Sequence, residues 1–190
     1  MAERPAHNRL VPGSNPGGPT TNQPVVHIAL LTPEIPHNTG NIIRLCANVG
    51  ATLHLIGPLG FDLYHPRLRR AALDYRDLAN VITYESWARF TKAHPLGSRT
   101  FATAPVTGIP YTEPSYQRGD TILFGPEGSG LPNQILSKFP HQNRIHIPML
   151  STTRSLNLSN AAAIIIYEMW KQMEFAGVEV DDMVPKVNFS

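Results

Sequence analysis

Apolar and polar positions along this chain follow two periods, one typical of strands and one typical of helices. Helical spacing is clear behind the first apolar run, where Ile42, Leu45, Cys46 and Val49 fall at i, i+3, i+4 and i+7 before Gly50 ends the helix. Strand and helix then alternate, which predicts an α/β fold with a mostly parallel sheet flanked by helices. The apolar runs that predict strands are 25–32, 52–57, 80–84, 99–104, 121–124 and 145–149.

The last predicted helix is apolar nearly all round, so we expect it to be buried on two sides. Ser155, Asn157 and Ser159 precede or open it, and these residue types cap helix N-termini. The polar loop 151–157 is thus held between a strand and a buried helix, a setting that keeps a ligand site in shape. The two apolar stripes of the helix are Ala161, Ile165, Met169 and Met173, and Ala162, Ile166 and Trp170.

Composition fits one ordinary globular domain. The chain has 190 residues, of which 42% are hydrophobic and 16% are charged, and no apolar run is long enough to span a bilayer. We predict an ordered domain at 25–177, a disordered tail at 1–24 and a short tail at 178–190. Cys46 is the one cysteine and lies in an apolar stripe, so we expect a core thiol and a cytoplasmic location.

Two stretches carry candidate chemistry. Asn38, Asn41 and Arg44 lie near a helix N-terminus behind a strand, a place suited to an anion, although a capping Asn and a solvated Arg would give the same pattern. Residues 121–132, TILFGPEGSGLP, place Glu127 in a glycine-rich turn that lets a ligand approach the backbone. The turn lacks the lysine of a phosphate loop and the glycine spacing of a dinucleotide fingerprint. A purely structural turn stays open.

The parallel sheet would bring these stretches together. Loops after Leu31, Thr103, Phe124 and Met149 all follow strands, so they should converge at the carboxyl edge of the sheet, where ligands bind. Elsewhere, a cluster of arginines with tyrosines and a histidine favours a nucleic-acid backbone, with a solvated helix face as the alternative. Its centre is Arg67, Arg69 and Arg70. The eight histidines show no ligand spacing, so no metal site is expected.

Three segments, taken in order, resemble the motifs of the SPOUT class of RNA methyltransferases. They are NTGNIIR at 38–44, FGPEGSGLP at 124–132 and IPMLSTTRSLNLSNAAAIIIYE at 147–168. The resemblance covers residues 25–177 and is closest to the TrmL-like branch, which methylates the ribose 2'-hydroxyl of the tRNA wobble nucleotide. It implies a C-terminal trefoil knot, S-adenosylmethionine as cofactor and S-adenosylhomocysteine as product.

The same resemblance assigns roles by motif position. A homodimer is implied, with Tyr167 of the last helix near its interface, and the arginine cluster would grip the tRNA anticodon stem-loop. Thr103 stands where relatives often carry leucine. The cofactor-contacting positions are Thr103, Gly125, Ile147 and Ser155. The catalytic positions are Asn38, Arg44, Glu127, Ser155 and Asn157.

The implied reaction moves a methyl group to the 2'-hydroxyl of a wobble cytidine or modified uridine, with a leucine tRNA as the expected substrate. Because a guanidinium stays protonated at neutral pH, Arg44 is a poor proton acceptor, and we expect it to fix a phosphate beside the target ribose. Two alternatives stay open. One is 2'-O-methylation at another tRNA or rRNA position, and the other is a non-catalytic, cofactor-sensing RNA-binding module.

Overall fold

A computed structural model describes residues 24–62, 80–97, 99–105, 107–150 and 155–178. Its strands form one seven-stranded sheet in the order β3-β2-β1-β6-β4-β7-β5, and all six pairings are parallel. The predicted α/β fold with a mostly parallel sheet is therefore confirmed. The strands are β1 (His27–Leu31), β2 (Thr52–Ile56), β3 (Val81–Tyr84), β4 (Thr100–Thr103), β5 (Ile109–Pro110), β6 (Thr121–Phe124) and β7 (Arg144–His146).

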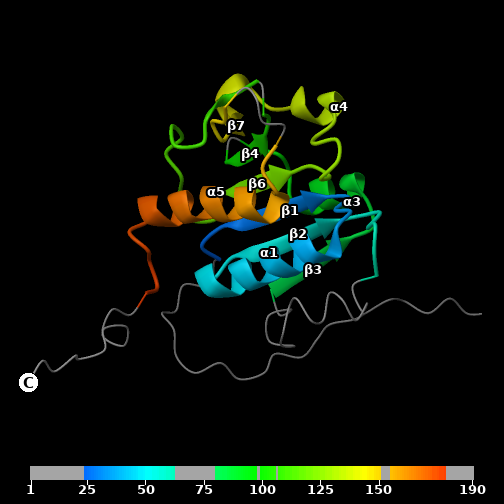
Figure 1. Cartoon of the computed structure of the whole chain (residues 1–190), viewed down its shortest axis with the longest axis horizontal. Coiled ribbons are helices and arrows are strands. Elements are labelled where there is room, and N and C mark those ends of the chain that lie inside the picture. Colours follow the sequence, from blue (N-terminus) through cyan, green and yellow to red (C-terminus); the bar gives the residue numbers. More distant parts are fainter. Residues whose placement is uncertain (1–23, 63–79, 98, 106, 151–154, 179–190) are drawn as a thin grey trace, which may run out of the picture.

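Helices cover both faces of this sheet. Helices α1 and α5 contact each other and lie side by side across one face (Figure 1). Helices α3 and α4 pack on the opposite face, where Phe90 and Leu136 join the second apolar cluster. The helices are α1 (Pro36–Val49), α3 (Trp87–Ala93), α4 (Asn133–Leu136) and α5 (Leu158–Gln172), with a short 3₁₀ turn η2 (His141–Asn143).

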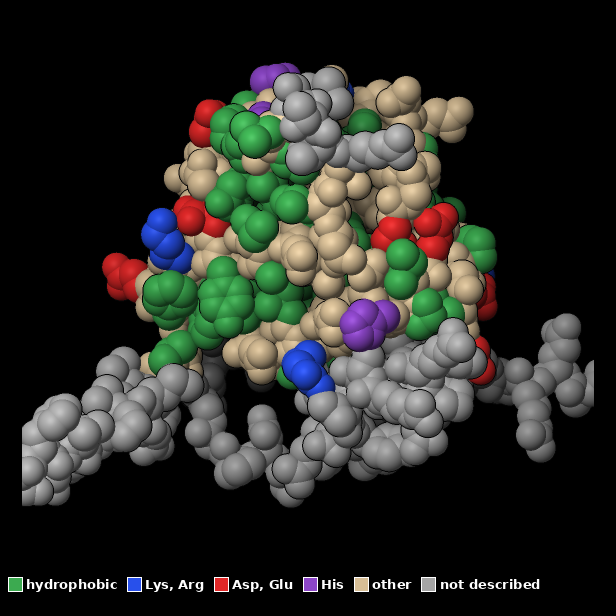
Figure 2. All heavy atoms as spheres, in the orientation of Figure 1, with side chains coloured by type: hydrophobic (Ala, Val, Ile, Leu, Met, Phe, Trp, Pro, Cys, Tyr) green, Lys and Arg blue, Asp and Glu red, His purple; other side chains and the backbone are tan. Residues whose placement is uncertain are grey.

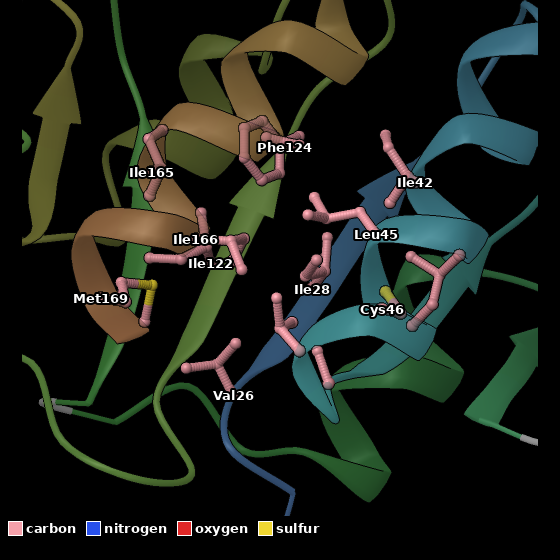
Figure 3. Close-up of a cluster of buried hydrophobic side chains, with 14 of the residues drawn as sticks. Val26, Ile28, Ile42, Leu45, Cys46, Ile122, Phe124, Ile165, Ile166 and Met169 are labelled. Carbon is pink, nitrogen blue, oxygen red and sulfur yellow. The ribbon is translucent and has the colours of Figure 1, made fainter. Parts of the chain in front are cut away.

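Strand alternation divides the core into two layers. On β1, Ile28 and Leu30 face α1 and α5, whereas Ala29 and Leu31 belong to the cluster on the other face. Figure 3 shows side chains of α5 pointing toward Ile122 and Phe124, beside those of α1. Both faces of the central strands are thus buried, as expected for a parallel sheet.

The first helix ends where the sequence predicts, because Gly50 adopts a left-handed conformation with φ of 68°. Cys46 is fully buried in the α1 stripe, and this burial raises the pKa of its thiol to about 12. The prediction of a core thiol is confirmed.

Strand β7 is shorter in the structure than predicted, and helix α4 has only four residues. Strand β7 ends at His146 instead of Met149, because Pro148 has no N–H to donate to a ladder. Helix α4 ends at Leu136, and the amides of Lys138 and Phe139 then donate to carbonyls three residues back in tight turns.

A chain of aromatic rings, with His54 fully buried and the others half-buried, joins three strands on the α3 face. His27 Nδ1 lies 2.9 Å from His54 Nε2, His54 Nδ1 lies 3.1 Å from the Tyr84 hydroxyl, and that hydroxyl lies 2.9 Å from His94 Nε2. Burial, reinforced by His94 and His27, lowers the pKa of the fully buried His54 to about 3. The cluster therefore packs in its neutral form at pH 7.

Acid should destabilise the fold through His54. The unfolded chain binds a proton near the ordinary histidine pKa of 6.5 and the folded chain does not, so stability falls as pH drops below about 6.5 and levels off near 3. We expect about 2 kcal/mol less free energy of unfolding at pH 5 than at pH 7.5, measured by urea denaturation. His54→Gln should flatten this dependence, whereas His37→Gln at an exposed position of α1 should keep it.

Candidate active site

A cavity of about 710 Å³ opens at the carboxyl edge of the sheet. Segments that follow β1, β4, β6 and β7 line it, so the four loops converge as the sequence predicts. All four predicted cofactor positions are among its lining residues, namely Thr103, Gly125, Ile147 and Ser155. Four of the five predicted catalytic residues line it as well, namely Asn38, Glu127, Ser155 and Asn157.

The glycine-rich turn after β6 forms one wall of the cavity. Gly125 is needed there because a Cβ at this position would lie 2.2 Å from the carbonyl carbon of Gly130 and 2.3 Å from the backbone nitrogen of Leu131. The turn folds back on itself, with the Gly130 amide donating to the Pro126 carbonyl at 2.9 Å. A side chain would push the two halves of this wall apart.

Beside the turn, Thr103 ends β4. Its hydroxyl donates to the Leu123 carbonyl at 3.2 Å and so ties β4 to the neighbouring strand β6. Thr103 is also among the residues that line the cavity.

A directional series of hydrogen bonds crosses the cavity. Glu127 Oε1 accepts from Asn38 Nδ2 at 3.1 Å, and Asn38 Oδ1 accepts from Asn157 Nδ2 at 2.9 Å. Asn157 Oδ1 then accepts from the backbone amides of Ser159 at 2.9 Å and Asn160 at 3.4 Å, which caps α5. An ionised carboxylate only accepts hydrogen bonds, so Glu127 fixes the orientation of both amides.

One carboxylate beside the cavity, that of Glu34, was not predicted from the sequence. Glu34, in the loop between β1 and α1, accepts from the Gly128 amide at 3.0 Å through Oε2. In return Glu127 accepts from the amides of Glu34 at 2.8 Å and Ile35 at 3.2 Å. The available signal was its position, directly after a predicted strand and Pro33, at the edge where ligands bind.

Arg44 lies apart from the other predicted catalytic residues. Asn38 turns inward and is 3% exposed, whereas Asn41 and Arg44 are exposed on α1. Arg44 is not among the described residues that line the cavity. Asn38 is therefore buried where Asn41 and Arg44 face solvent, and a shared anion site of the three residues stays a prediction.

Both apolar stripes predicted for α5 are buried within the chain, and a third side of the helix is exposed. Ile165 and Met169 of one stripe and Ala162, Ile166 and Trp170 of the other are at most 9% exposed, but Ile164 is 37% and Tyr167 is 45% exposed. Figure 2 shows hydrophobic side chains gathered over this helix. The expected burial on two sides is thus confirmed, and Ile164 and Tyr167, which belong to neither predicted stripe, form a further apolar side that is exposed.

Three further predictions concern the arginine cluster, a metal site and a membrane-spanning helix. Arg67, Arg69 and Arg70 lie outside the described residues. Across the described ranges, no group of three or more His, Cys, Asp or Glu side chains is placed to hold a metal ion. In the same ranges, no helix has the length and apolar character needed to cross a membrane.

Comparison with known proteins gives a consistent group of relatives. The profile of the SpoU rRNA Methylase family matches residues 25–167. A tRNA (cytidine(34)-2'-O)-methyltransferase of Methylovorus glucosotrophus is 48% identical over 150 residues, which cover 79% of this chain and 97% of that protein. The enzyme of that name from Escherichia coli K12 is 44% identical over 158 residues, which cover 83% of this chain and 100% of that protein.

Solved structures agree with the sequence matches. One described as structural insights into the 2-OH methylation of C/U34 on tRNA has a TM-score of 0.74 and 42% identity, covering 80% of this chain and 97% of that one. An AdoMet-bound rRNA methyltransferase from Sinorhizobium meliloti has a TM-score of 0.69 and 23% identity, covering 80% of this chain and 58% of that one. The second likeness shows the fold alone.

Proposed function

The chain belongs to the SpoU rRNA methylase family, and from this we propose that it methylates the ribose 2'-hydroxyl of the wobble nucleotide of a tRNA. S-adenosylmethionine is the methyl donor and S-adenosylhomocysteine the product. One observation carries the proposal: the cavity at the carboxyl edge combines the glycine-rich wall with the ordered Glu127, Asn38 and Asn157 series. Relatives that align over 97% or more of their length are named for methylation at position 34 of tRNA.

The residues around the cavity fit the proposed cofactor. A volume of about 710 Å³ lies within the range of cofactor sites, and a mixture of apolar side chains and glycine backbone suits a flat ring system. Gly125 leaves no room for a side chain that would fill this wall. When bound, S-adenosylmethionine supplies an electrophilic methyl group on a sulfonium sulfur.

The chain's own residues then have two tasks. They hold the ribose hydroxyl in line with the methyl group, and they let its proton leave as the new C–O bond forms. Alignment of two reactants is worth roughly 7–11 kcal/mol at best, so a rigid site matters more than a strong base. Ser155 and Asn157 line the cavity, Asn157 as a member of the ordered series, and they orient the ribose or the cofactor.

Arg44 fixes a phosphate next to the target ribose, and the proton leaves with help from that phosphate or from water. Its exposed position on α1, outside the cavity wall, favours a phosphate contact over proton abstraction inside the cavity. Arg44→Lys keeps the charge but loses the two-pronged geometry.

We therefore expect Arg44→Lys to lower the single-turnover methylation rate at neutral pH by about tenfold or more. The measurement uses saturating cofactor and tRNA. Arg89→Lys, an exposed arginine on α3, serves as the matched control and should keep the wild-type rate. A lysine variant with most of the rate would contradict the phosphate role.

The enzyme acts as a homodimer through α5. Support comes from the exposed Ile164 and Tyr167, which extend the apolar surface of a helix whose other side is already buried. Tyr167 also stacks edge to face on Trp170, with ring centroids 5.7 Å apart, so it is held in place for a partner. Light scattering should give twice the chain mass of 21.0 kDa, and a mass of 21.0 kDa would contradict the dimer.

Other assignments stay predictions. Binding of the anticodon stem-loop backbone by Arg67, Arg69 and Arg70 predicts weaker tRNA binding with a flatter salt dependence when all three are replaced by alanine. The trefoil knot stays a prediction, and residues 151–154 of the segment between β7 and α5 lie outside the described residues. A leucine tRNA as substrate and a cytoplasmic location also stay predictions.

The function is tested by tritiated methyl transfer to bulk tRNA from a strain that lacks this gene, followed by nuclease digestion and mass spectrometry. We expect a 2'-O-methylated pyrimidine at the first anticodon position. Methylation at another tRNA or rRNA position would keep the chemistry and overturn the site. Cofactor binding without any transfer would instead establish a non-catalytic, cofactor-sensing module.

A further inference from the structure

We propose that Glu34 is a positioning residue that sets cofactor affinity by clamping the glycine-rich turn to the loop before α1. The inference rests on the proposed function, because it concerns the same cavity. Glu34 itself is not among the described residues that line this cavity, whereas its partner Gly128 is. Any effect of Glu34 on the cofactor therefore passes through the turn.

The clamp is reciprocal. The Glu34 carboxylate accepts from the Gly128 amide at 3.0 Å, and the Glu127 carboxylate accepts from the Glu34 and Ile35 amides at 2.8 and 3.2 Å. Each loop thus contributes a side chain that bonds to the backbone of the other. Hydrogen bonds from backbone amides to carboxylates are among the stronger kind, so two loops far apart in sequence are held together at this point.

The carboxylates of Glu127 and Glu34 hold different parts of the site. Glu127 also holds Asn38 and, through it, Asn157, so its loss disturbs the groups that face the ribose. Glu34 reaches Gly128, whose turn walls the cavity. Removal of Glu34 should therefore weaken cofactor binding more than it slows methyl transfer at saturating cofactor.

Gly128 is the matching half of the clamp. A Cβ at this position would lie 3.3 Å from Glu34 Oε2, closer than an ordinary contact, so an alanine would press on the carboxylate. If the two residues act as one unit, the effects of Gly128→Ala and Glu34→Ala will not add in the double variant.

Loss of the Glu34 carboxylate should change cofactor affinity only moderately. The hydrogen bond between Glu34 and Gly128 is exposed to solvent, where water competes for both partners. We therefore expect a moderate loss, with the dissociation constant for S-adenosylmethionine rising about fivefold in Glu34→Ala. The rate at saturating cofactor should stay within about twofold.

Calorimetric titration of the full chain with S-adenosylmethionine gives the first readout. Glu34→Gln keeps an oxygen that accepts from the Gly128 amide, so it should restore affinity to within about twofold. Glu113→Ala removes an exposed carboxylate that is not among the residues lining the cavity, and it should bind like wild type. Wild-type affinity in Glu34→Ala would overturn the proposal.

Amide hydrogen exchange without cofactor gives an independent readout. The Gly128 amide should exchange faster in Glu34→Ala than in wild type, whereas the Glu34→Gln variant should resemble wild type. Unchanged exchange would overturn the clamp. If the wild-type chain binds no S-adenosylmethionine, the proposed function fails, and the exchange result still decides whether the clamp exists.

Discussion

Replacement of Gly125 by alanine is expected to abolish detectable cofactor binding, with at least about a hundredfold loss of affinity. The new Cβ would lie 2.2 Å from the carbonyl carbon of Gly130 and 2.3 Å from the Leu131 nitrogen. Both are backbone atoms that no side-chain rotation can move away. The turn has to open, and the cavity loses one wall.

The measurement for Gly125→Ala is calorimetric titration together with thermal unfolding. Gly97→Ala is the matched control, because a Cβ at Gly97 meets nothing within 4 Å. The control should keep wild-type affinity and stability. A Gly125→Ala chain that is folded and binds like wild type would show that the wall does not contact the cofactor.

Asn38→Asp is expected to lower the methylation rate by at least about a hundredfold, although the two side chains have nearly the same shape. The aspartate has no N–H to donate to Glu127 Oε1, which accepts from Asn38 Nδ2 at 3.1 Å. It places a second carboxylate against the first in a position that is 3% exposed. Repulsion between the two carboxylates should displace the first turn of α1 and the glycine-rich turn that carries Glu127. It should also lower the free energy of unfolding.

Two further variants serve as comparisons for the rate of Asn38→Asp. Asn157→Asp also loses a bond to Asn38, but its carboxylate still accepts from the amides of Ser159 and Asn160 and favours the N-terminus of α5. Its rate should fall less than that of Asn38→Asp. Asn48→Asp makes the same substitution at an exposed position of α1 and should be neutral. Equal rates for Asn38→Asp and Asn48→Asp would exclude the directional series.

Much of the site follows from the sequence because parallel strands bring their following loops to one edge. Thr103, Gly125 and Asn157 lie in three separate stretches, yet Thr103 lies near the end of a predicted strand, Gly125 follows another, and Asn157 opens the last helix. Hydrophobic periodicity is sufficient to locate the strands. Because ligands bind beyond the carboxyl ends of parallel strands, the strand positions then indicate which loops form the site.

The parts that were missed depend on pairings between distant segments. Glu34 has no local signal beyond its loop, because its partner Gly128 lies 94 residues away. Packing on the sheet likewise decides which face of α1 meets the cavity. As a result the Asn38 side chain is buried and the Arg44 side chain is exposed. The spacing of polar residues within one helix does not contain this information.

The position of β1 in the sheet has a consequence for synthesis of the chain. Its neighbours are β2, which follows closely, and β6, whose Thr121 pairs with His27. Ribosomes add about 5–20 residues per second, so one edge of β1 waits roughly 5–20 seconds for its partner. During that time an apolar strand edge is available to other chains, and chaperone demand should be highest before residue 124 emerges.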